Sequence, residues 1–140
     1  MILIDTNVLV ALVDPRDPLR ERVLADYEKL KRPQFLLPSV VLAECGYILK
    51  YPFLRKKLRA LLKELLIEPY ALSEEARLWD DIFDWLAKYG EHRPDMTDAF
   101  LVILAHRDRS LKIWTYDSEF WEIWRLPDGR AVPLAATAPR

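Results

Sequence analysis

The stretch MILIDTNVLV at positions 1–10 decides the fold of this chain. Its short apolar run, Ile2–Ile4, predicts a strand buried on both faces, and Asp5 follows where that strand would end. The next two residues are typical of a helix start, and the apolar run at 8–13 predicts that the helix continues. An ionised carboxylate beside a buried strand is costly unless something compensates it. Asp5 therefore either caps the following helix or belongs to a functional site.

Length and composition indicate one globular domain spanning 1–140. The chain has 140 residues, of which 51% are hydrophobic and 31% are charged, and this is enough to build a proper core. The Ala- and Pro-rich end at 135–140 is expected to fray. A formal net charge of −1 excludes a binder driven by a bulk basic field, but it leaves a local basic face possible.

Cysteine usage and hydropathy bear on the compartment. Cys45 is the only cysteine, so an intramolecular disulfide and a cysteine-based zinc cage are both excluded. The N-terminus lacks the basic segment and cleavage site of a signal peptide, and no apolar run approaches the roughly 18 residues of a membrane span. We therefore expect a cytoplasmic protein with no membrane segment.

Short apolar strands alternate with helical patterns along the rest of the chain. The predicted strands after the first are Phe35–Leu37, 67–72, 111–115 and a last one at 131–134. Pro69 makes the 67–72 strand an edge candidate. The predicted helices cover 19–30, 38–50, 54–66, 73–89, 95–107 and 117–124. This alternation predicts an α/β fold of three layers, α/β/α, with a central parallel sheet of four to five short strands.

Four acidic residues stand beside buried apolar sequence. Asp5 and Asp117 each follow a predicted strand, so both should lie at the carboxyl edge of the sheet, where ligands bind in such folds. Glu44 is the only charge between positions 35 and 49, and Asp98 lies in the first turn of the most apolar helix. Asp95 is a possible fifth member, although capping of that helix is the preferred explanation.

A hard divalent cation is the physical explanation for such a cluster. Clustered carboxylates repel one another and raise one another's pKa, whereas Mg²⁺ or Mn²⁺ takes oxygen ligands and bridges carboxylates to phosphate oxygens. The reaction class that follows is metal-assisted hydrolysis of a phosphodiester. The competing explanation for each acid is a helix cap, a favourable charge at a helix N-terminus or, for Glu44, a salt bridge.

The ordered set of motifs resembles the PIN-domain ribonucleases, and most closely the VapC-type toxins of toxin–antitoxin pairs. The resemblance rests on four segments in the family's order, namely Ile4-Asp5-Thr6-Asn7, Pro38-Ser39 followed by Glu44, Asp98-Ala99, and Thr115-Tyr116-Asp117-Ser118-Glu119-Phe120. Each motif alone is weak, but the set covers nearly the whole chain.

This resemblance implies a parallel sheet, a Mg²⁺ or Mn²⁺ site and endoribonuclease activity on RNA. It carries the catalytic and metal-binding roles onto Asp5, Glu44, Asp98 and Asp117. The residues expected to orient these ligands or their waters are Thr6, Asn7, Thr115 and Ser118. It also implies a homodimer, and a small VapB-like antitoxin protein whose tail covers the acidic pocket.

Other readings of the same residues stay open or fail on particular positions. An aspartyl-phosphate phosphatase would need a second Asp where this chain has Asn7, and a receiver domain would need a lysine that the segment around Asp117 does not offer. A stand-alone RNA-processing nuclease without an antitoxin, and a catalytically silent PIN-like binding module, remain as alternatives. The silent module would be marked by loss of acids, and none of the four is lost.

Two surfaces are candidates for contacts with macromolecules. The predicted helix 54–66 has a basic face formed by Arg55, Lys56, Lys57, Arg59 and Lys63. Such a face is usually just solvated, and holding RNA phosphates is the alternative. Trp79, Phe83 and Trp124 are expected at the surface, where they would contribute to a dimer.

Overall fold

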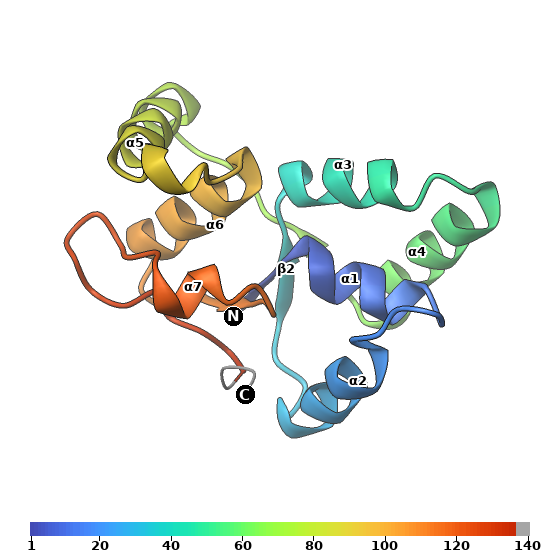
Figure 1. The fold of residues 1–140 in the computed structure, drawn as a ribbon. Coiled ribbons are helices and arrows are strands. Elements are labelled where there is room, and N and C mark those ends of the chain that lie inside the picture. The colour runs from blue at the N-terminus through green and yellow to red at the C-terminus, as the bar shows by residue number, and fades with distance from the viewer. Residues whose placement is uncertain (137–140) are drawn as a thin grey trace.

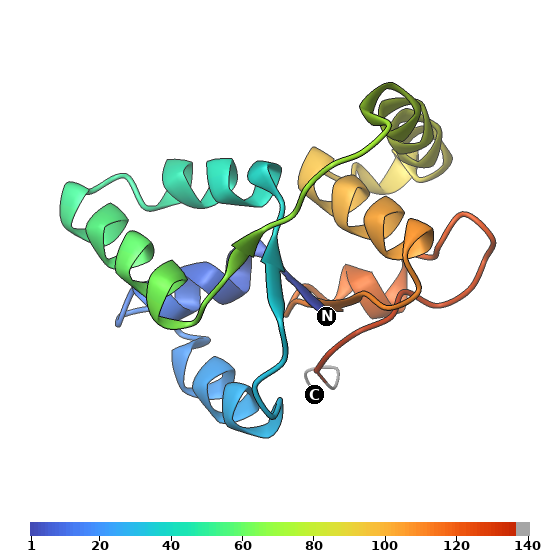
Figure 2. The ribbon, with the colours of Figure 1, turned by 180° about the vertical axis from the view of Figure 1, so that it is seen from behind.

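The computed structural model describes residues 1–136 and contains a four-stranded parallel sheet with the order β3-β2-β1-β4 (Figures 1 and 2). The strands are β1 (Ile2–Ile4), β2 (Phe35–Leu37), β3 (Glu68–Pro69) and β4 (Lys112–Trp114). The predicted fold class is confirmed: the chain is an α/β protein whose parallel sheet is flanked by helices.

Strand β1 lies between β2 and β4 in the sheet, and its three apolar side chains are all buried. Ile2 is in register with Phe35 of β2 on one side and with Lys112 of β4 on the other. Ile4 is in register with Trp114, so β1 and β4 end side by side. Asp5 N–H continues this ladder by donating to the Trp114 carbonyl at 3.0 Å.

Helices lie on both sides of the sheet. They are α1 (Thr6–Val13), α2 (Arg20–Lys29), α3 (Ser39–Ile48), α4 (Pro52–Glu64), α5 (Glu75–Lys88), the 3₁₀ helix η1 (Gly90–His92), α6 (Met96–Arg107) and α7 (Glu119–Glu122). Figure 1 shows the sheet nearly edge-on, with α1 to α4 on one side and α5 to α7 on the other. This is the three-layer arrangement that the alternating pattern predicts.

The strand order fixes where a ligand can enter. From β1 the chain steps in one direction to β2 and β3, and it then returns to place β4 against the opposite side of β1. The helices of the two halves consequently cover opposite faces of the sheet (Figure 1). In such sheets a ligand binds outside the carboxyl ends of the strands where the connections reverse, which here are β1 and β4. Residues that follow these two strands therefore face the same opening.

The outer strands differ from their predicted extents. The predicted strand 67–72 contracts to Glu68–Pro69 at the edge of the sheet, because Pro69 has no N–H with which to extend the ladder. The predicted strand at 131–134 is wrong: Leu134 makes only an isolated bridge to Ile113. Pro133 accepts from Ile113 N–H but has no N–H to donate, so the pairing does not propagate.

The most apolar helix behaves as predicted. Within α6, Ala99 and the segment 101–105 are buried, and they form one hydrophobic core with β1, β2 and β4. Among residues 1–136, no helix is both long and apolar enough to cross a membrane. Ala135 N–H donates to the Ile113 carbonyl at 2.9 Å, and the remainder of the expected frayed tail, 137–140, lies outside the described residues.

Candidate metal centre

Asp5 occupies the junction between β1 and α1, and it is buried. One carboxylate oxygen, Oδ1, accepts from Thr6 N–H at 2.7 Å, so Asp5 caps α1 as the simpler reading of the sequence expects. The other oxygen, Oδ2, accepts from Thr115 Oγ1 at 2.7 Å and from Asn7 Nδ2 at 3.3 Å. Capping therefore engages only Oδ1 of this carboxylate, while Oδ2 bonds to Thr115 at the end of β4.

Asn7 and Thr115 tie the ends of β1 and β4 together. Asn7 Nδ2 donates to Thr115 Oγ1 at 3.1 Å, and Asn7 Oδ1 accepts from Tyr116 N–H at 3.1 Å. Thr115 Oγ1 also accepts from Asp117 N–H at 3.1 Å, so one hydroxyl connects the backbone of Asp117 to the carboxylate of Asp5. Both residues therefore bond to the Asp5 carboxylate, and their role in orienting a metal ligand stays a prediction.

Glu44 reaches the same region from α3. Its Oε2 accepts from Thr97 Oγ1 at 2.6 Å, and Thr97 immediately precedes Asp98 on α6. Among residues 1–136, Glu44 is in no ion pair, so the structure does not support the salt-bridge explanation of Glu44. Sequence reasoning missed Thr97, although a hydroxyl at the start of an otherwise apolar helix was an available signal.

Asp98 and Asp95 have different tasks at the start of α6. Asp95 is exposed and caps the helix, because its Oδ1 accepts from Asp98 N–H at 2.8 Å. The side chain of Asp98 is buried in the first turn of the helix. The capping explanation of Asp95 is therefore correct, and it does not remove Asp95 from the neighbourhood of the other acids.

The acids face one pocket of about 280 Å³ at the carboxyl edge of the sheet. The lining contains six carboxylates, from Asp5, Asp17, Glu44, Asp95, Asp98 and Asp117. Thr6, Asn7, Val10 and Ile48 complete it, so no lysine, arginine or histidine contributes to the lining. Asp17 is a residue that sequence reasoning missed, since it lies in a proline-rich turn that shows no sign of where it folds.

Burial and mutual repulsion shift the pKa values of the two most buried acids. Removal from water, opposed by the hydrogen bonds from Thr115 and Thr6, raises the pKa of Asp5 to about 6. Burial, together with the negative charges of Asp95, Asp5 and Asp117, raises the pKa of Asp98 to about 9. In the absence of a cation, the pocket therefore holds protons that these carboxyls would ordinarily release.

The residues present fit a hard divalent ion in chemistry. Every charged donor is a carboxylate, and Thr6 adds a buried hydroxyl, Oγ1, with no hydrogen-bond partner among the described residues. Within 1–136 no group of three or more His, Cys, Asp or Glu side chains is arranged to hold an ion as it stands. Two of the four predicted ligands are anchored by neighbouring hydroxyls, Asp5 by Thr115 and Glu44 by Thr97.

Four other predicted residues lie outside the acidic pocket. Ser118 is exposed and does not line the acidic pocket, and its carbonyl accepts from the N–H groups of Trp121 and Glu122 in α7. Trp124 is fully buried, so its predicted place on the surface is wrong. Its ring packs edge-on against Trp85 at 5.2 Å between ring centroids. Trp79 and Phe83 are exposed as predicted.

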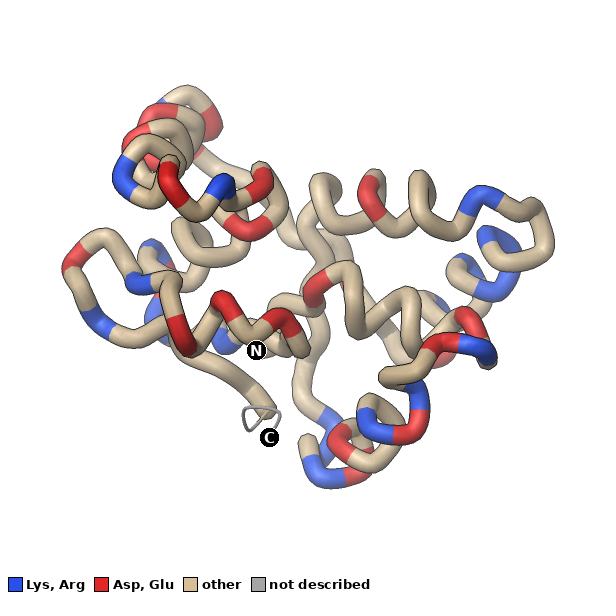
Figure 3. Tube along the Cα trace, in the orientation of Figure 1, with Lys and Arg blue, Asp and Glu red and all other residues tan. Residues whose placement is uncertain are grey.

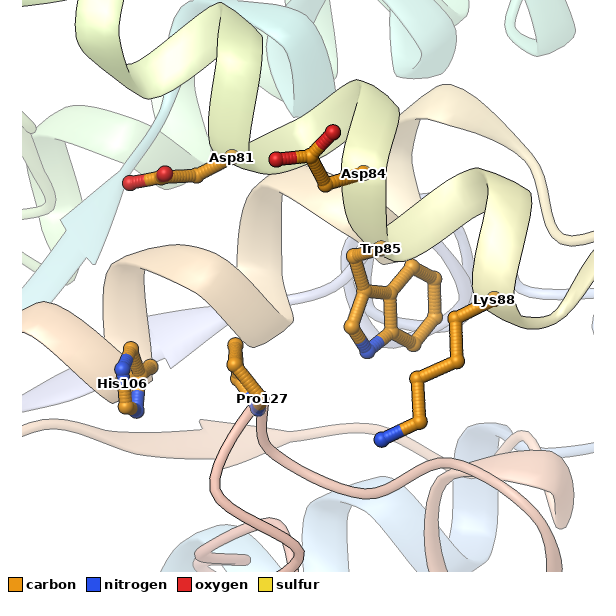
Figure 4. A pocket seen from close by; sticks show the side chains of 6 residues that line it. All are labelled: Asp81, Asp84, Trp85, Lys88, His106 and Pro127. Atoms are coloured by element: carbon orange, nitrogen blue, oxygen red, sulfur yellow. The ribbon is translucent and has the colours of Figure 1, made fainter.

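A second pocket, of about 230 Å³, lies between α5, α6 and the loop after α7 (Figure 4). It is lined by Asp81, Asp84, Trp85, Lys88, His106 and Pro127. It contains none of the predicted site residues. Its charges are of both signs, and Asp81 is already paired with Arg107 at 3.4 Å. The candidate site is therefore the acidic pocket.

Comparisons with known proteins agree with this geometry. A family model described as the PIN domain matches residues 2–125. The VapC20 structure from Mycobacterium tuberculosis, described as a sarcin–ricin loop cleaving toxin, is 18% identical at a TM-score of 0.65, over 83% of this chain and 88% of that one. FitAcB from Neisseria gonorrhoeae is 24% identical at a TM-score of 0.56, over 84% of this chain and 88% of that one.

A further solved structure, FitAB bound to an IR36 DNA fragment, is 23% identical to this chain at a TM-score of 0.60. The match covers 84% of this chain and 85% of that one. At these identities the solved structures support the fold alone. No curated protein gives a significant match to the chain.

Proposed function

The chain belongs to the PIN domain family, and from this membership together with the acidic pocket we propose that it is a metal-dependent endoribonuclease. The observation that carries the proposal is the set of six carboxylates around one pocket with no basic side chain in its lining. Such a set is unfavourable by itself and becomes favourable when a divalent cation binds. Phosphodiester hydrolysis is the reaction that this kind of centre performs.

The residues that would hold Mg²⁺ or Mn²⁺ are Asp5, Glu44, Asp98 and Asp117. A bound ion lowers the pKa of an attacking water and offsets the charge on the leaving oxygen. Asn7 and Thr115 fix the orientation of the Asp5 carboxylate, and Thr97 fixes that of Glu44. Asp95 would contribute negative charge near the mouth of the pocket while it caps α6.

The finer proposal is that this nuclease is the toxin of a VapBC-type pair. It is supported by the similar structures, one of which is described as a toxin. The partner would be a small VapB-like antitoxin that covers the acidic pocket. The alternatives are a stand-alone PIN-domain nuclease and a silent binding module. The retention of all four predicted acids in one pocket favours an active enzyme over the silent module.

We also propose that two copies of the chain associate through α5 and α6. Trp79 and Phe83 are exposed there, and with Ile82, Met96 and Phe100 they line an apolar depression of about 450 Å³. A large exposed apolar patch of this kind marks an interaction surface. Its edge lies at Met96, directly after Asp95 of the acidic pocket.

The experiment that tests the nuclease is incubation with end-labelled RNA in EDTA, in Mg²⁺ and in Mn²⁺. We expect no cleavage in chelator and internal cuts once either ion is added. Asp98→Asn should be inactive under all three conditions, and Asp80→Asn, on the exposed face of α5, should behave as wild type. Full activity in chelator would refute the metal mechanism. Co-purification with the product of the adjacent gene separates a toxin from a stand-alone nuclease.

A further inference from the structure

The helix that carries Glu44 also carries one exposed aromatic side chain, Tyr47. Glu44, Tyr47 and Ile48 follow the i, i+3, i+4 spacing that puts residues on one face of α3. Glu44 and Ile48 line the pocket, whereas the side chain of Tyr47 is 75% exposed. Tyr47 lies about one helical turn from Glu44, roughly 5 Å along the axis, and next to Ile48, so its backbone is close to the pocket although its side chain does not line it.

Two further aromatic rings continue this surface where α3 ends and α4 begins. Tyr51 is 60% exposed and Phe53 is 58% exposed, and their rings are stacked at 6.0 Å between centroids. Lys50 Nζ lies 5.5 Å from the centroid of the Tyr47 ring. We call Tyr47, Tyr51 and Phe53 the aromatic surface. The stacked pair of Tyr51 and Phe53, together with the exposed ring of Tyr47 four residues before Tyr51, indicates a ligand or partner, since single exposed apolar residues are normal but groups of them are not.

The helix beyond the aromatic surface is strongly basic. Lys56, Arg59 and Lys63 lie on the face of α4 opposite the buried Leu54 and Leu58. Among residues 1–136, none of these three cations is in an ion pair. The basic face that the sequence predicts is therefore free to hold anions.

The other flank of the acidic pocket has the opposite character. In Figure 3, Lys and Arg mark α4, whereas Asp and Glu predominate on α5. The acids of α5 are Glu75, Asp80, Asp81 and Asp84, against the bases Arg77 and Lys88. A polyanion that reaches the pocket is thus repelled along α5 and attracted along the end of α3 and the start of α4.

We propose that single-stranded RNA leaves the acidic pocket across the aromatic surface, with bases stacked on its rings and phosphates held by Lys50 and Lys56. This inference rests on the proposed ribonuclease function and names the path of its substrate. Stacking suits single strands because every base has a flat face, and nearby cations follow the backbone. The combination of exposed rings with unpaired cations favours RNA over a protein partner, for which the uncharged depression at Trp79 and Phe83 is better suited.

The test is binding of a fluorescent single-stranded RNA of about ten nucleotides. The protein is the Asp98→Asn variant in EDTA, so that RNA is not cut during the measurement. Tyr47→Leu removes an exposed ring and keeps an apolar side chain. Its control is Leu24→Ala, which removes an exposed apolar side chain on α2, outside the aromatic surface and outside the depression at Trp79. We expect Tyr47→Leu and Tyr51→Ala to weaken binding roughly 5- to 150-fold each. Tyr47→Phe and Leu24→Ala should bind as the parent does.

Salt dependence provides a second readout. Removal of one phosphate contact by Lys56→Ala should reduce the slope of log K against log salt by about 0.7. Unchanged affinity in both Tyr47→Leu and Tyr51→Ala would overturn the inference, as would equal losses in Leu24→Ala. A change of oligomeric state in Tyr47→Leu with unchanged RNA affinity would also overturn it, and would assign the face to a second copy of the chain.

The inference and the proposed function can fail separately. RNA binding in EDTA needs neither an ion nor cleavage, so it tests only whether the aromatic surface binds RNA. Cleavage of RNA by the wild-type protein with Mg²⁺ or Mn²⁺ tests the proposed nuclease function. If the wild-type protein cleaves RNA but the ring variants bind RNA normally, only the proposed path of the RNA is refuted. If binding depends on the rings but the wild-type protein cleaves no RNA, only the proposed nuclease function is refuted.

Discussion

Thr115 Oγ1 donates a hydrogen bond of 2.7 Å to Asp5 Oδ2, although the two residues are 110 positions apart in the chain. This bond joins the ends of β1 and β4, the two strands that meet where the direction of the sheet connections reverses. It also lowers the pKa of Asp5 against the larger upward effect of burial. Thr115 therefore controls both the position and the charge of the most buried candidate ligand.

Thr115→Val keeps the shape of this side chain and removes its hydroxyl. The Oδ2 of Asp5 then loses its shortest partner, and the N–H of Asp117 loses its acceptor. We expect the free energy of unfolding to fall by about 1–3 kcal/mol, because buried polar groups are left unsatisfied. Nuclease activity should fall with it. Stability is measured by urea denaturation and activity by RNA cleavage, with Thr115→Ser, which keeps the hydroxyl, as the control. Equal losses of stability and activity in both variants would show that packing matters and the hydrogen bond does not.

Asp98→Asn should separate stability from activity. Burial and the charges of Asp95, Asp5 and Asp117 oppose ionisation of Asp98, so an amide of nearly the same shape removes an unfavourable group. Without metal at neutral pH, the variant should melt at or above the wild-type temperature while it is catalytically inactive. It should also gain less from added Mg²⁺. Melting well below wild type in EDTA would instead indicate a structural role, with Asp80→Asn as the control for loss of an exposed charge.

The stability of the metal-free protein should decline as pH rises. A carboxyl whose folded-state pKa lies above its unfolded value of 3.8 binds its proton more tightly in the folded protein, so folding is disfavoured once pH exceeds that value. The effect of Asp5 should develop up to about pH 6, and that of Asp98 should continue to about pH 9. The slope for each group is at most about 1.4 kcal/mol per pH unit.

Urea denaturation in EDTA across this pH range measures the decline, and added Mg²⁺ should reduce it by binding the folded state. The Asp98→Asn variant should lack the part of the decline above about pH 6. A profile that is flat, or that rises through this window in the wild-type protein, would contradict the pKa directions assigned to the pocket.

Phe83→Glu should weaken the proposed association of two copies. The side chain is exposed in the apolar depression between α5 and α6, and a carboxylate there would have to be desolvated on contact. Light scattering at micromolar concentration should report a dimer for wild type and a monomer for the variant. Leu24→Glu, at an exposed apolar residue on α2, should stay dimeric. A wild-type monomer would refute the association.

Much of the fold and of the site follows from local sequence. Ile2–Ile4 and Phe35–Leu37 form strands at their predicted bounds, because short apolar runs followed by polar or proline residues have few other uses. The four predicted acids meet in one pocket because each stands at a strand end or on a helix bordering the carboxyl edge of the sheet. Their roles as metal ligands stay predictions.

The remainder depends on contacts between distant elements. Asp17 joins the site only because a turn folds against it, and its local sequence shows no motif for this. Thr97 has a local signal, a hydroxyl at the start of an apolar helix, but its bond to Glu44 depends on how α6 packs against α3. Trp124 was expected at the surface, but its ring packs against Trp85 of α5 and against Tyr89, the residue that follows α5. The sequence alone predicts that Pro69 lies in an edge strand. The failure of the segment at Pro133 to form a strand could not be predicted in this way, because it depends on which strand lies opposite.

Calorimetric titration of Mn²⁺ into the metal-free protein tests the central claim most directly. We predict saturable binding by wild type at about neutral pH, and binding at least about tenfold weaker in Asp98→Asn and Asp117→Asn, each of which removes one charged oxygen donor. Asp80→Asn should bind as wild type does. Wild-type affinity in both pocket variants, or no binding by the wild-type protein, would contradict a metal centre at Asp5, Glu44, Asp98 and Asp117.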